Sequence, residues 1–93
     1  MMYELTYEDS ALKDIKRIKK SGNKSLIKKL EDLLCEIAEN PRSGTGQPEQ
    51  LKHYPFKQTW SRRLNQEYRL VYEIHDEIIT VKVISAADHY GDK

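Results

Sequence analysis

The chain has little cysteine, little net charge and no long apolar run, and each shortage excludes a class of protein. A single thiol cannot form an internal disulfide, so the fold must depend on its core. The apolar runs are only a few residues long, far below the roughly 20 that cross a bilayer. With no basic leader followed by an apolar stretch, we expect a cytoplasmic protein with no membrane segment.

Charge is plentiful but balanced, because 16 Lys and Arg face 15 Asp and Glu for a formal net charge of +1. The molecule as a whole therefore has no strong attraction for nucleic acid, and any RNA site must come from local clustering of cations. The lone Cys35 lies among leucines and isoleucines, which predicts a buried, inert thiol. Ninety-three residues predict a single domain over 1–93, with residues 91–93 as a flexible tail.

Apolar periodicity predicts both helices and strands. Alternation over residues 2–7 predicts a strand, and the steps of Leu12, Ile15 and Ile18 predict a first helix. A second helical stripe ends before Pro41, which forbids its continuation. Further strands are predicted at residues 59–65, 68–74 and 77–86. The fold class is therefore α+β: a two-helix hairpin packed on a twisted, mainly antiparallel sheet of about four strands, in the order strand, helix, helix, strand, strand, strand.

Alternation along residues 68–74 divides their side chains between two faces of the sheet. Leu70, Tyr72 and Ile74 share one face, which we expect to pack on the helices, and Arg69 then projects from the open face. Arg62 and Arg63 must point to opposite faces, so one of them joins Arg69. The pattern does not say which.

The side chains between residues 47 and 90 match those that a metal-free RNA cleavage site needs. Attack of a 2′-hydroxyl on the adjacent phosphate requires a base, cations around the phosphorane and an acid for the departing oxygen. Glu49 fits the base, and His89 fits the acid. Arg69 and Lys52 fit a phosphate clamp. Two aromatic residues fit the stacking or orientation of exposed bases: Trp60 and Tyr90.

Each of these residues also has a structural interpretation. Glu49 follows a proline in a polar loop and resembles an ordinary solvated carboxylate, and His89 lies near a chain end. A cross-strand partner, Glu67 or a neighbour of Glu73, would explain Arg69. Histidines and carboxylates show no metal-ligand spacing, so no metal or cofactor is predicted. Two further histidines are interpreted as structural or solvent-facing: His53 and His75.

Four segments together resemble one known family. They are Ser-Gly-Thr-Gly-Gln-Pro-Glu-Gln-Leu-Lys-His at 43–53, Trp-Ser-Arg-Arg at 60–63, Tyr-Arg-Leu-Val-Tyr at 68–72 and His-Tyr at 89–90. The chain is similar to bacterial toxins of the Txe/YoeB branch of the RelE/ParE superfamily. The resemblance implies a RelE-like fold and a ribosome-dependent messenger RNA endoribonuclease that cuts in the ribosomal A site. It departs at residues 91–93, which follow the His-Tyr pair, and at Tyr68, where a histidine is frequent.

The resemblance also implies residue roles and partners. It makes Glu49 the general base, Arg69 the phosphate-stabilising residue and His89 the general acid. Tyr90 then positions the substrate, and Lys52 is a further phosphate contact. Trp60, Arg62 and Arg63 complete the predicted RNA-binding set. The implied partners are a cognate YefM-type antitoxin, the ribosome with its messenger RNA, and a second copy in a homodimer. The alternative is a ParE-like toxin of the same fold that inhibits a topoisomerase by binding.

Overall fold

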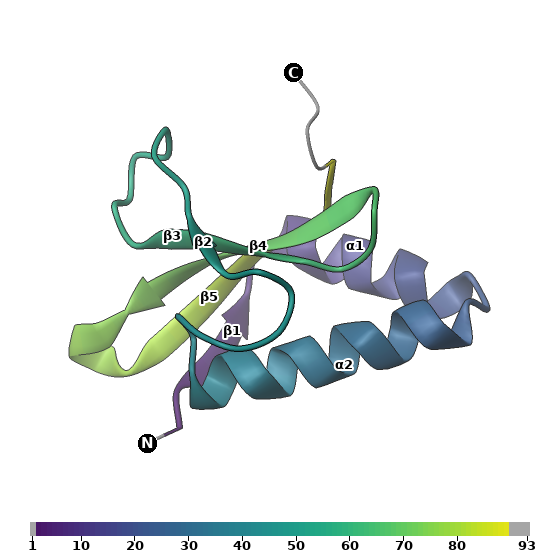
Figure 1. The fold of residues 1–93 in the computed structure, drawn as a ribbon, viewed down its shortest axis with the longest axis horizontal. Helices are drawn as coiled ribbons and strands as arrows, with labels where there is room; N and C mark the ends of the chain where they lie inside the picture. The colour runs from purple at the N-terminus through teal and green to yellow at the C-terminus, as the bar shows by residue number, and fades with distance from the viewer. Residues whose placement is uncertain (1, 90–93) are drawn as a thin grey trace.

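A mixed sheet of five strands organises the molecule, in the order β1-β5-β4-β3-β2 (Figure 1). The structure is a computed structural model that describes residues 2–89, the side chain of His89 excepted. Strands β3, β4 and β5 form the predicted antiparallel meander, and β1 adds to β5 in parallel. The strand bounds are β1 Glu4–Tyr7, β2 Glu49–Gln50, β3 Thr59–Arg63, β4 Tyr68–His75 and β5 Thr80–His89. The α+β prediction is confirmed, with β2 as a strand that the sequence pattern did not indicate.

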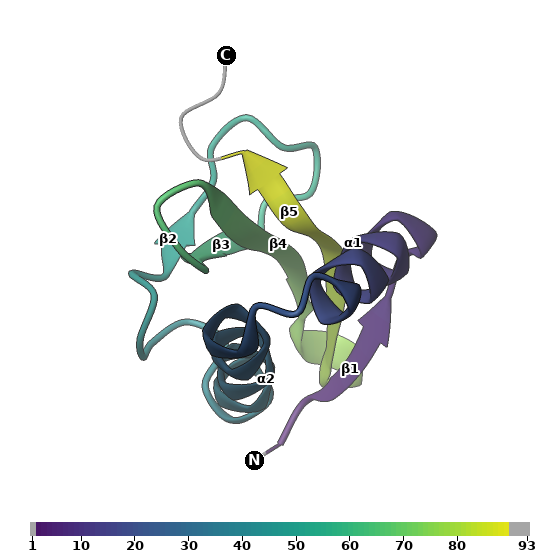
Figure 2. The same ribbon diagram turned by 90° about the vertical axis from the view of Figure 1, so that its right-hand side faces the viewer.

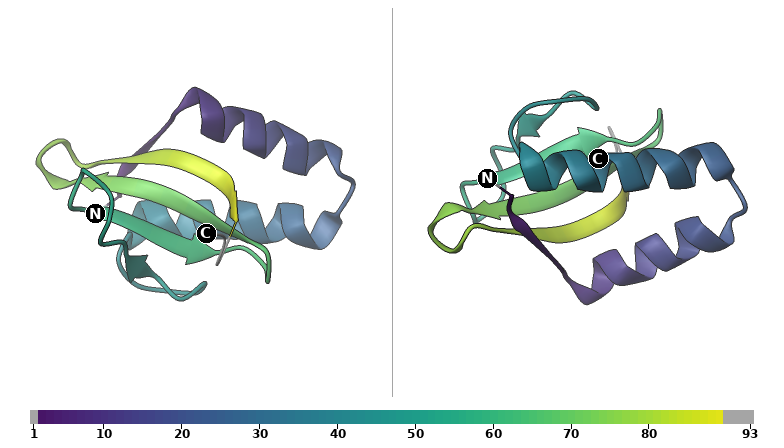
Figure 3. Two further views of the ribbon diagram at one scale, coloured as in Figure 1. Left: turned by 90° about the horizontal axis from the view of Figure 1, so that it is seen from above. Right: turned by 90° about the horizontal axis from the view of Figure 1, so that it is seen from below.

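Two helices cover one face of this sheet, and the other face, which we call the uncovered face, carries no helix among residues 2–89 (Figures 2 and 3). Helix α1 spans Asp9–Lys20 and α2 spans Lys24–Glu39. The Asn23 side chain caps α2 by accepting a hydrogen bond from the Leu26 N–H at 3.1 Å. Seen from below in Figure 3, both helices lie in front of the strands. No helix within residues 2–89 is long and apolar enough to cross a membrane.

The core lies between the helices and the sheet, as the alternation along β4 predicted. Leu70, Tyr72 and Ile74 are buried in one cluster with Leu33 and Ile37 of α2. Arg69 and Glu73 occupy the alternate positions along β4, so they belong to the uncovered face. The sheet therefore separates an apolar side from a side that can bear polar chemistry.

Two local predictions are corrected. The last strand begins at Thr80 rather than at Glu77, because a short 3-10 helix, Asp76–Ile78, fills the connection and Ile79 adopts a left-handed backbone with φ 49°. Cys35 is exposed, not buried. It lies two residues after the buried Leu33, which places it about 200° around the helix axis and away from the core.

Candidate active site

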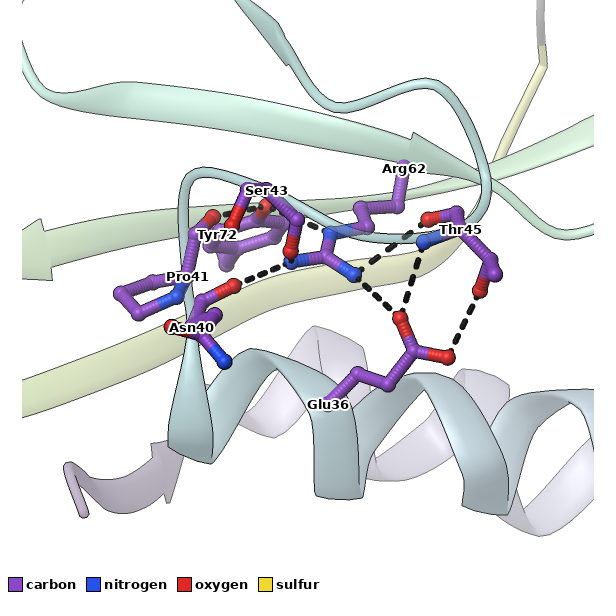
Figure 4. A network of polar contacts seen from close by, with 7 residues as sticks. All are labelled: Glu36, Asn40, Pro41, Ser43, Thr45, Arg62 and Tyr72. Carbon is purple, nitrogen blue, oxygen red and sulfur yellow. Dashed lines mark hydrogen bonds and ion pairs between the residues drawn. The ribbon is translucent and has the colours of Figure 1, made fainter. Parts of the chain in front are cut away.

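Arg62 is wholly buried beneath the loop that joins α2 to β2, and Figure 4 shows its surroundings (Figure 4). Its guanidinium lies 3.0 Å from the Glu36 carboxylate and donates 3.2 Å to the Tyr72 hydroxyl oxygen. It also donates to three backbone carbonyls, those of Asn40, Ser43 and Thr45. The prediction that Arg62 binds RNA is therefore wrong, because its charge is already satisfied inside the protein.

Glu36 holds the same loop from the helix side. The Thr45 backbone N–H donates to it at 2.9 Å and the Thr45 hydroxyl at 2.8 Å. These hydrogen bonds, with a smaller contribution from the charge of Arg62, lower the pKa of the Glu36 carboxyl. On the other side of the network, burial raises the pKa of the Tyr72 hydroxyl. The loop that carries the Ser-Gly-Thr-Gly motif, residues 43–46, therefore lies over the buried Arg62 side chain.

The course of this loop requires glycine at two positions. Gly44 has φ +129°, and a Cβ there would lie 2.5 Å from the Glu36 Oε1. Gly46 has φ +82°, and its carbonyl accepts a hydrogen bond from the Arg63 N–H at 2.6 Å. The chain is therefore held against β3 immediately before Glu49, which begins the short strand β2.

The strand registers place Glu49 and Arg69 on the same face of the sheet. Glu49 pairs with Ser61, and Ser61 pairs with Val71. Two residues further along, Arg63 pairs with Arg69. Because opposed residues share a face and side chains alternate along a strand, all five belong to the face without helices, where Ser61 and Val71 are themselves buried. Arg63, not Arg62, is the arginine beside Arg69.

An open depression of about 550 Å³ joins three of the predicted site residues, Glu49, Lys52 and Arg69. The remaining lining comes from the last residue of β2 and from the start of the loop that follows it: Gln50, Leu51, His53 and Tyr54. His53 is exposed, as its interpretation as structural or solvent-facing predicted, but the sequence analysis did not assign it to this depression. The sequence signal that could have assigned His53 to the site is its position next to Lys52, in a segment that also carries Glu49.

Arg69 has a partner that the sequence analysis did not name. Its Nε donates to the Asp88 Oδ2 at 2.6 Å, and the two side chains are 20% and 32% exposed. The sequence analysis suggested Glu67 or a neighbour of Glu73, and the ion pair that the structure shows is made instead across the strands to Asp88 of β5. A partly buried, charge-assisted contact fixes the Arg69 guanidinium more firmly than a surface ion pair would.

Trp60 lies on the other face of the sheet. It pairs with Tyr72, and its ring packs against the core cluster. Its indole N–H donates to the Gln58 side chain at 3.2 Å, and the Arg42 guanidinium lies 6.0 Å from the ring centroid. The sheet therefore separates Trp60 from Arg69, and the predicted stacking of Trp60 on RNA bases stays a prediction.

The last residue of β5, His89, lies with its backbone beside the start of β4, near Arg69. His89 pairs with Tyr68, next to the pair formed by Arg69 and Asp88. The side chain of His89 and the whole of Tyr90 lie outside the described residues, so their roles stay predictions. Within residues 2–89, no group of three or more histidine, cysteine or carboxylate residues is placed to hold a metal ion.

The depression combines a carboxylate with two cations, Arg69 and Lys52. Within residues 2–89, the Glu49 carboxylate has neither a hydrogen bond nor an ion pair, and its residue is exposed. Arg69 is anchored on a central strand, and Lys52 extends from a loop. Such a groove can hold an anionic diester between the cations and place a proton acceptor beside it.

Comparison with known proteins first assigns a class. The chain shares its fold with solved bacterial toxins, including "The structure of YoeB dimer from Staphylococcus aureus", at a TM-score of 0.81 and 34% identity, over 97% of this chain and 100% of that one. A heterotetrameric YoeB-YefM toxin-antitoxin complex from Staphylococcus aureus matches at a TM-score of 0.77 and 34% identity, with the same coverage of both chains.

The sequence then assigns the family. Residues 7–90 match the YoeB-like toxin of bacterial type II toxin-antitoxin systems. Toxin YoeB of Synechocystis sp. is 42% identical over 69 residues, which are 74% of this chain and 77% of that protein. The chain belongs to the YoeB-like toxin family.

Proposed function

We propose that this toxin is a ribosome-dependent endoribonuclease that cleaves messenger RNA in the ribosomal A site. The observation that carries the proposal is the single depression shared by Glu49, Lys52 and Arg69. A toxin that acted only by binding would have no need to place Glu49, a carboxylate without a partner among residues 2–89, in one depression with an anchored arginine and a lysine.

In the proposed reaction, Glu49 takes the proton of the 2′-hydroxyl as that oxygen attacks the adjacent phosphorus. Arg69 and Lys52 stabilise the extra negative charge of the phosphorane. The bond from phosphorus to the 5′-oxygen then breaks, and His89 gives a proton to the departing oxygen. The products are a 2′,3′-cyclic phosphate and a 5′-hydroxyl. This chemistry uses side chains alone, with Tyr90 positioning the substrate.

The face around the depression supplies further RNA contacts. Arg63 is directly opposite Arg69 on β3, so two arginines lie side by side on adjacent strands. The two paired arginines, together with Lys52 at the depression, suit a phosphate backbone. We assign Arg63 to RNA binding in place of Arg62.

The partners follow from the solved relatives. Staphylococcus aureus YoeB occurs as a dimer and in a heterotetramer with YefM. We infer that this chain forms a homodimer and is neutralised by a YefM-type antitoxin in the cytoplasm. An antitoxin that covers the depression would block Glu49 and Arg69 together.

The test is induction of the toxin in bacterial cells, followed by mapping of new messenger RNA 5′ ends. We expect new ends in frame with codons of translated messages, and their loss in Glu49→Ala and Arg69→Ala. Matched controls are Glu31→Ala and Arg17→Ala, exposed positions on the two helices away from the sheet's uncovered face. Circular dichroism and thermal melts verify that each variant folds.

Growth arrest without new RNA ends would overturn the nuclease proposal. If broken DNA accumulated while messages stayed intact, the ParE-like alternative of topoisomerase inhibition would replace it. Cleavage that persists in full in Arg69→Ala would instead contradict the assignment of Arg69 as the phosphate-stabilising residue.

A further inference from the structure

Two extra residues in β5 change which side chain stands opposite Arg69. Tyr72 pairs with Val83, Val71 with Ser85 and Arg69 with Asp88, so the register shifts by one residue between Tyr72 and Val71 and again between Val71 and Arg69. If the register of Tyr72 and Val83 continued without these shifts, Ala86 would stand opposite Arg69. The second shift, a bulge at Ala86 and Ala87, completes the displacement and brings Asp88 opposite Arg69.

The bulge is held from the helix layer by Asp14 of α1. One oxygen of this carboxylate, Oδ2, accepts the backbone N–H of Ala86 at 3.1 Å and that of Ala87 at 3.2 Å. The Asp14 side chain is only 16% exposed, whereas Arg17, whose Nη2 lies 3.7 Å from its other oxygen, is 74% exposed. Asp14 therefore gives two backbone donors of the bulge a buried acceptor.

Asp88 completes a chain of contacts that ends at the proposed phosphate clamp. Arg69 has many rotamers, and its position on β4 fixes its backbone but not its guanidinium. The 2.6 Å contact from Nε to Asp88 fixes the plane of the guanidinium at the edge of the depression that also holds Glu49. A displacement of about 1 Å in such a group can lower the rate by as much as about 100-fold.

We propose that Asp88 is the positioning residue for Arg69, placed in register by the bulge that Asp14 holds. The proposal deepens the proposed function and rests on it for its kinetic consequence. Neither Asp14 nor Asp88 takes part in the proposed proton transfers. Their role is to set the direction of the Arg69 guanidinium before RNA arrives.

The experiment compares Asp88→Ala with Asp88→Asn in cleavage of messenger RNA on purified ribosomes. Alanine removes the acceptor, and we expect kcat to fall about tenfold or more. Asparagine keeps an oxygen that can accept from Nε, and we expect it to restore kcat to within about threefold of wild type. Asp32→Ala, which removes an exposed ion pair with Lys28 on α2, is the matched control and should not change the rate.

Asp14 gives a second, independent comparison. Asp14→Ala should lower kcat, and adding it to Asp88→Ala should cost little more, because both changes release the same guanidinium. Arg17→Ala removes the exposed partner of Asp14 and should leave kcat unchanged. Fully additive losses in the double variant, or equal losses in Asp88→Ala and Asp88→Asn, would overturn the proposal.

A measurement without catalysis separates this proposal from the nuclease proposal. The Nε–H resonance of Arg69, assigned by its absence in Arg69→Lys, should exchange slowly with solvent in the wild type and in Asp88→Asn. In Asp88→Ala it should exchange at least about tenfold faster. If the exchange rates differ as expected but the wild type cuts no RNA, the nuclease proposal is wrong, whereas the proposal that Asp88 positions Arg69 is supported. If exchange is the same in all three proteins, Asp88 does not position Arg69.

Discussion

Glu36 of α2 and Arg62 of β3 form an ion pair of 3.0 Å that joins the helix layer to the sheet. The Arg62 side chain is 0% exposed and that of Glu36 is 36% exposed, so one partner is fully desolvated and the other still meets water. The loop that covers Arg62 continues directly into β2 and Glu49. This ion pair therefore supports the site without belonging to it.

Replacing Arg62 should destabilise the whole protein. Arg62→Met keeps the length of the side chain but leaves the Glu36 carboxylate without its cation and the loop carbonyls without their donor. We expect the free energy of unfolding to fall by about 3 kcal/mol, measured by urea denaturation. Lys28→Met removes an exposed ion pair on the same helix as Glu36 and should cost about 0.5 kcal/mol or less. Equal losses in the two variants would contradict the structural role of Arg62.

The same network should make stability depend on acid pH. The folded pKa of Glu36 lies below its ordinary value of 4.5, chiefly through the Thr45 hydrogen bonds. A depressed folded pKa adds stability above the unfolded value, and this stability is lost as the pH falls through the folded pKa. The stability difference between wild type and Glu36→Gln should thus be constant above about pH 5 and shrink steadily below pH 4.5.

The measurement is a series of urea titrations of both proteins from pH 6 down to about pH 3. Asp76 also has a lowered pKa, caused first by its hydrogen bond with Arg42, but it is present in both proteins and cancels in the difference. Glu31→Gln reports the general effect of losing one negative charge from α2. A difference that grows as the pH falls would refute the assignment.

Periodicity predicted the helices and the core face of β4, because in each case several apolar side chains repeat in phase. Leu70, Tyr72 and Ile74 alternate in a run long enough to fix their common face. Strand β2 has only two residues, so no alternation exists to detect it. The position of β2 is set by the contacts between the preceding loop and Arg62. These are tertiary contacts, which leave no local pattern in the sequence.

Residue type singled out members of the candidate site, but the sequence did not predict their geometry. Glu49 and Arg69 stood out as a carboxylate and a strand arginine, and the structure places both in one depression. The choice between Arg62 and Arg63 needed the register of β3 against β4, which alternation alone does not give. Asp88 was missed because the predicted strand ended at residue 86, and because two register shifts in β5, which leave no sequence signal, bring Asp88 rather than Ala86 opposite Arg69.

Two glycines with left-handed backbones should respond differently to alanine. A Cβ at Gly44 would lie 2.5 Å from the Glu36 Oε1 and 2.9 Å from the Arg62 Nη1, whereas a Cβ at Gly22 meets nothing within 4 Å. Gly22→Ala should therefore cost about 1 kcal/mol, from backbone strain alone. Gly44→Ala adds a steric clash with the ion pair and should cost about 3 kcal/mol. Thermal and urea denaturation of both variants measure the difference, and a Gly44→Ala cost no larger than that of Gly22→Ala would contradict this account of the loop.

RNA binding should distinguish the two faces of β3. Arg63 pairs with Arg69 on the uncovered face, so Arg63→Ala should weaken binding of single-stranded RNA and reduce the salt dependence of the affinity by roughly one phosphate contact. Trp60 lies on the opposite face, where its indole bonds to Gln58. Trp60→Phe should therefore lower the melting temperature by a few degrees and leave RNA affinity within about twofold.

The measurement is fluorescence anisotropy of a labelled oligonucleotide at several salt concentrations, in a Glu49→Gln background that prevents cleavage. Because Arg63 and Trp60 are three positions apart on one strand, a general disturbance of β3 would weaken binding in both variants. Loss confined to Arg63→Ala would support the strand register as the basis of RNA recognition. Loss confined to Trp60→Phe would place the RNA on the side of the sheet that carries Arg42, and the proposed path of the phosphate backbone would have to be abandoned.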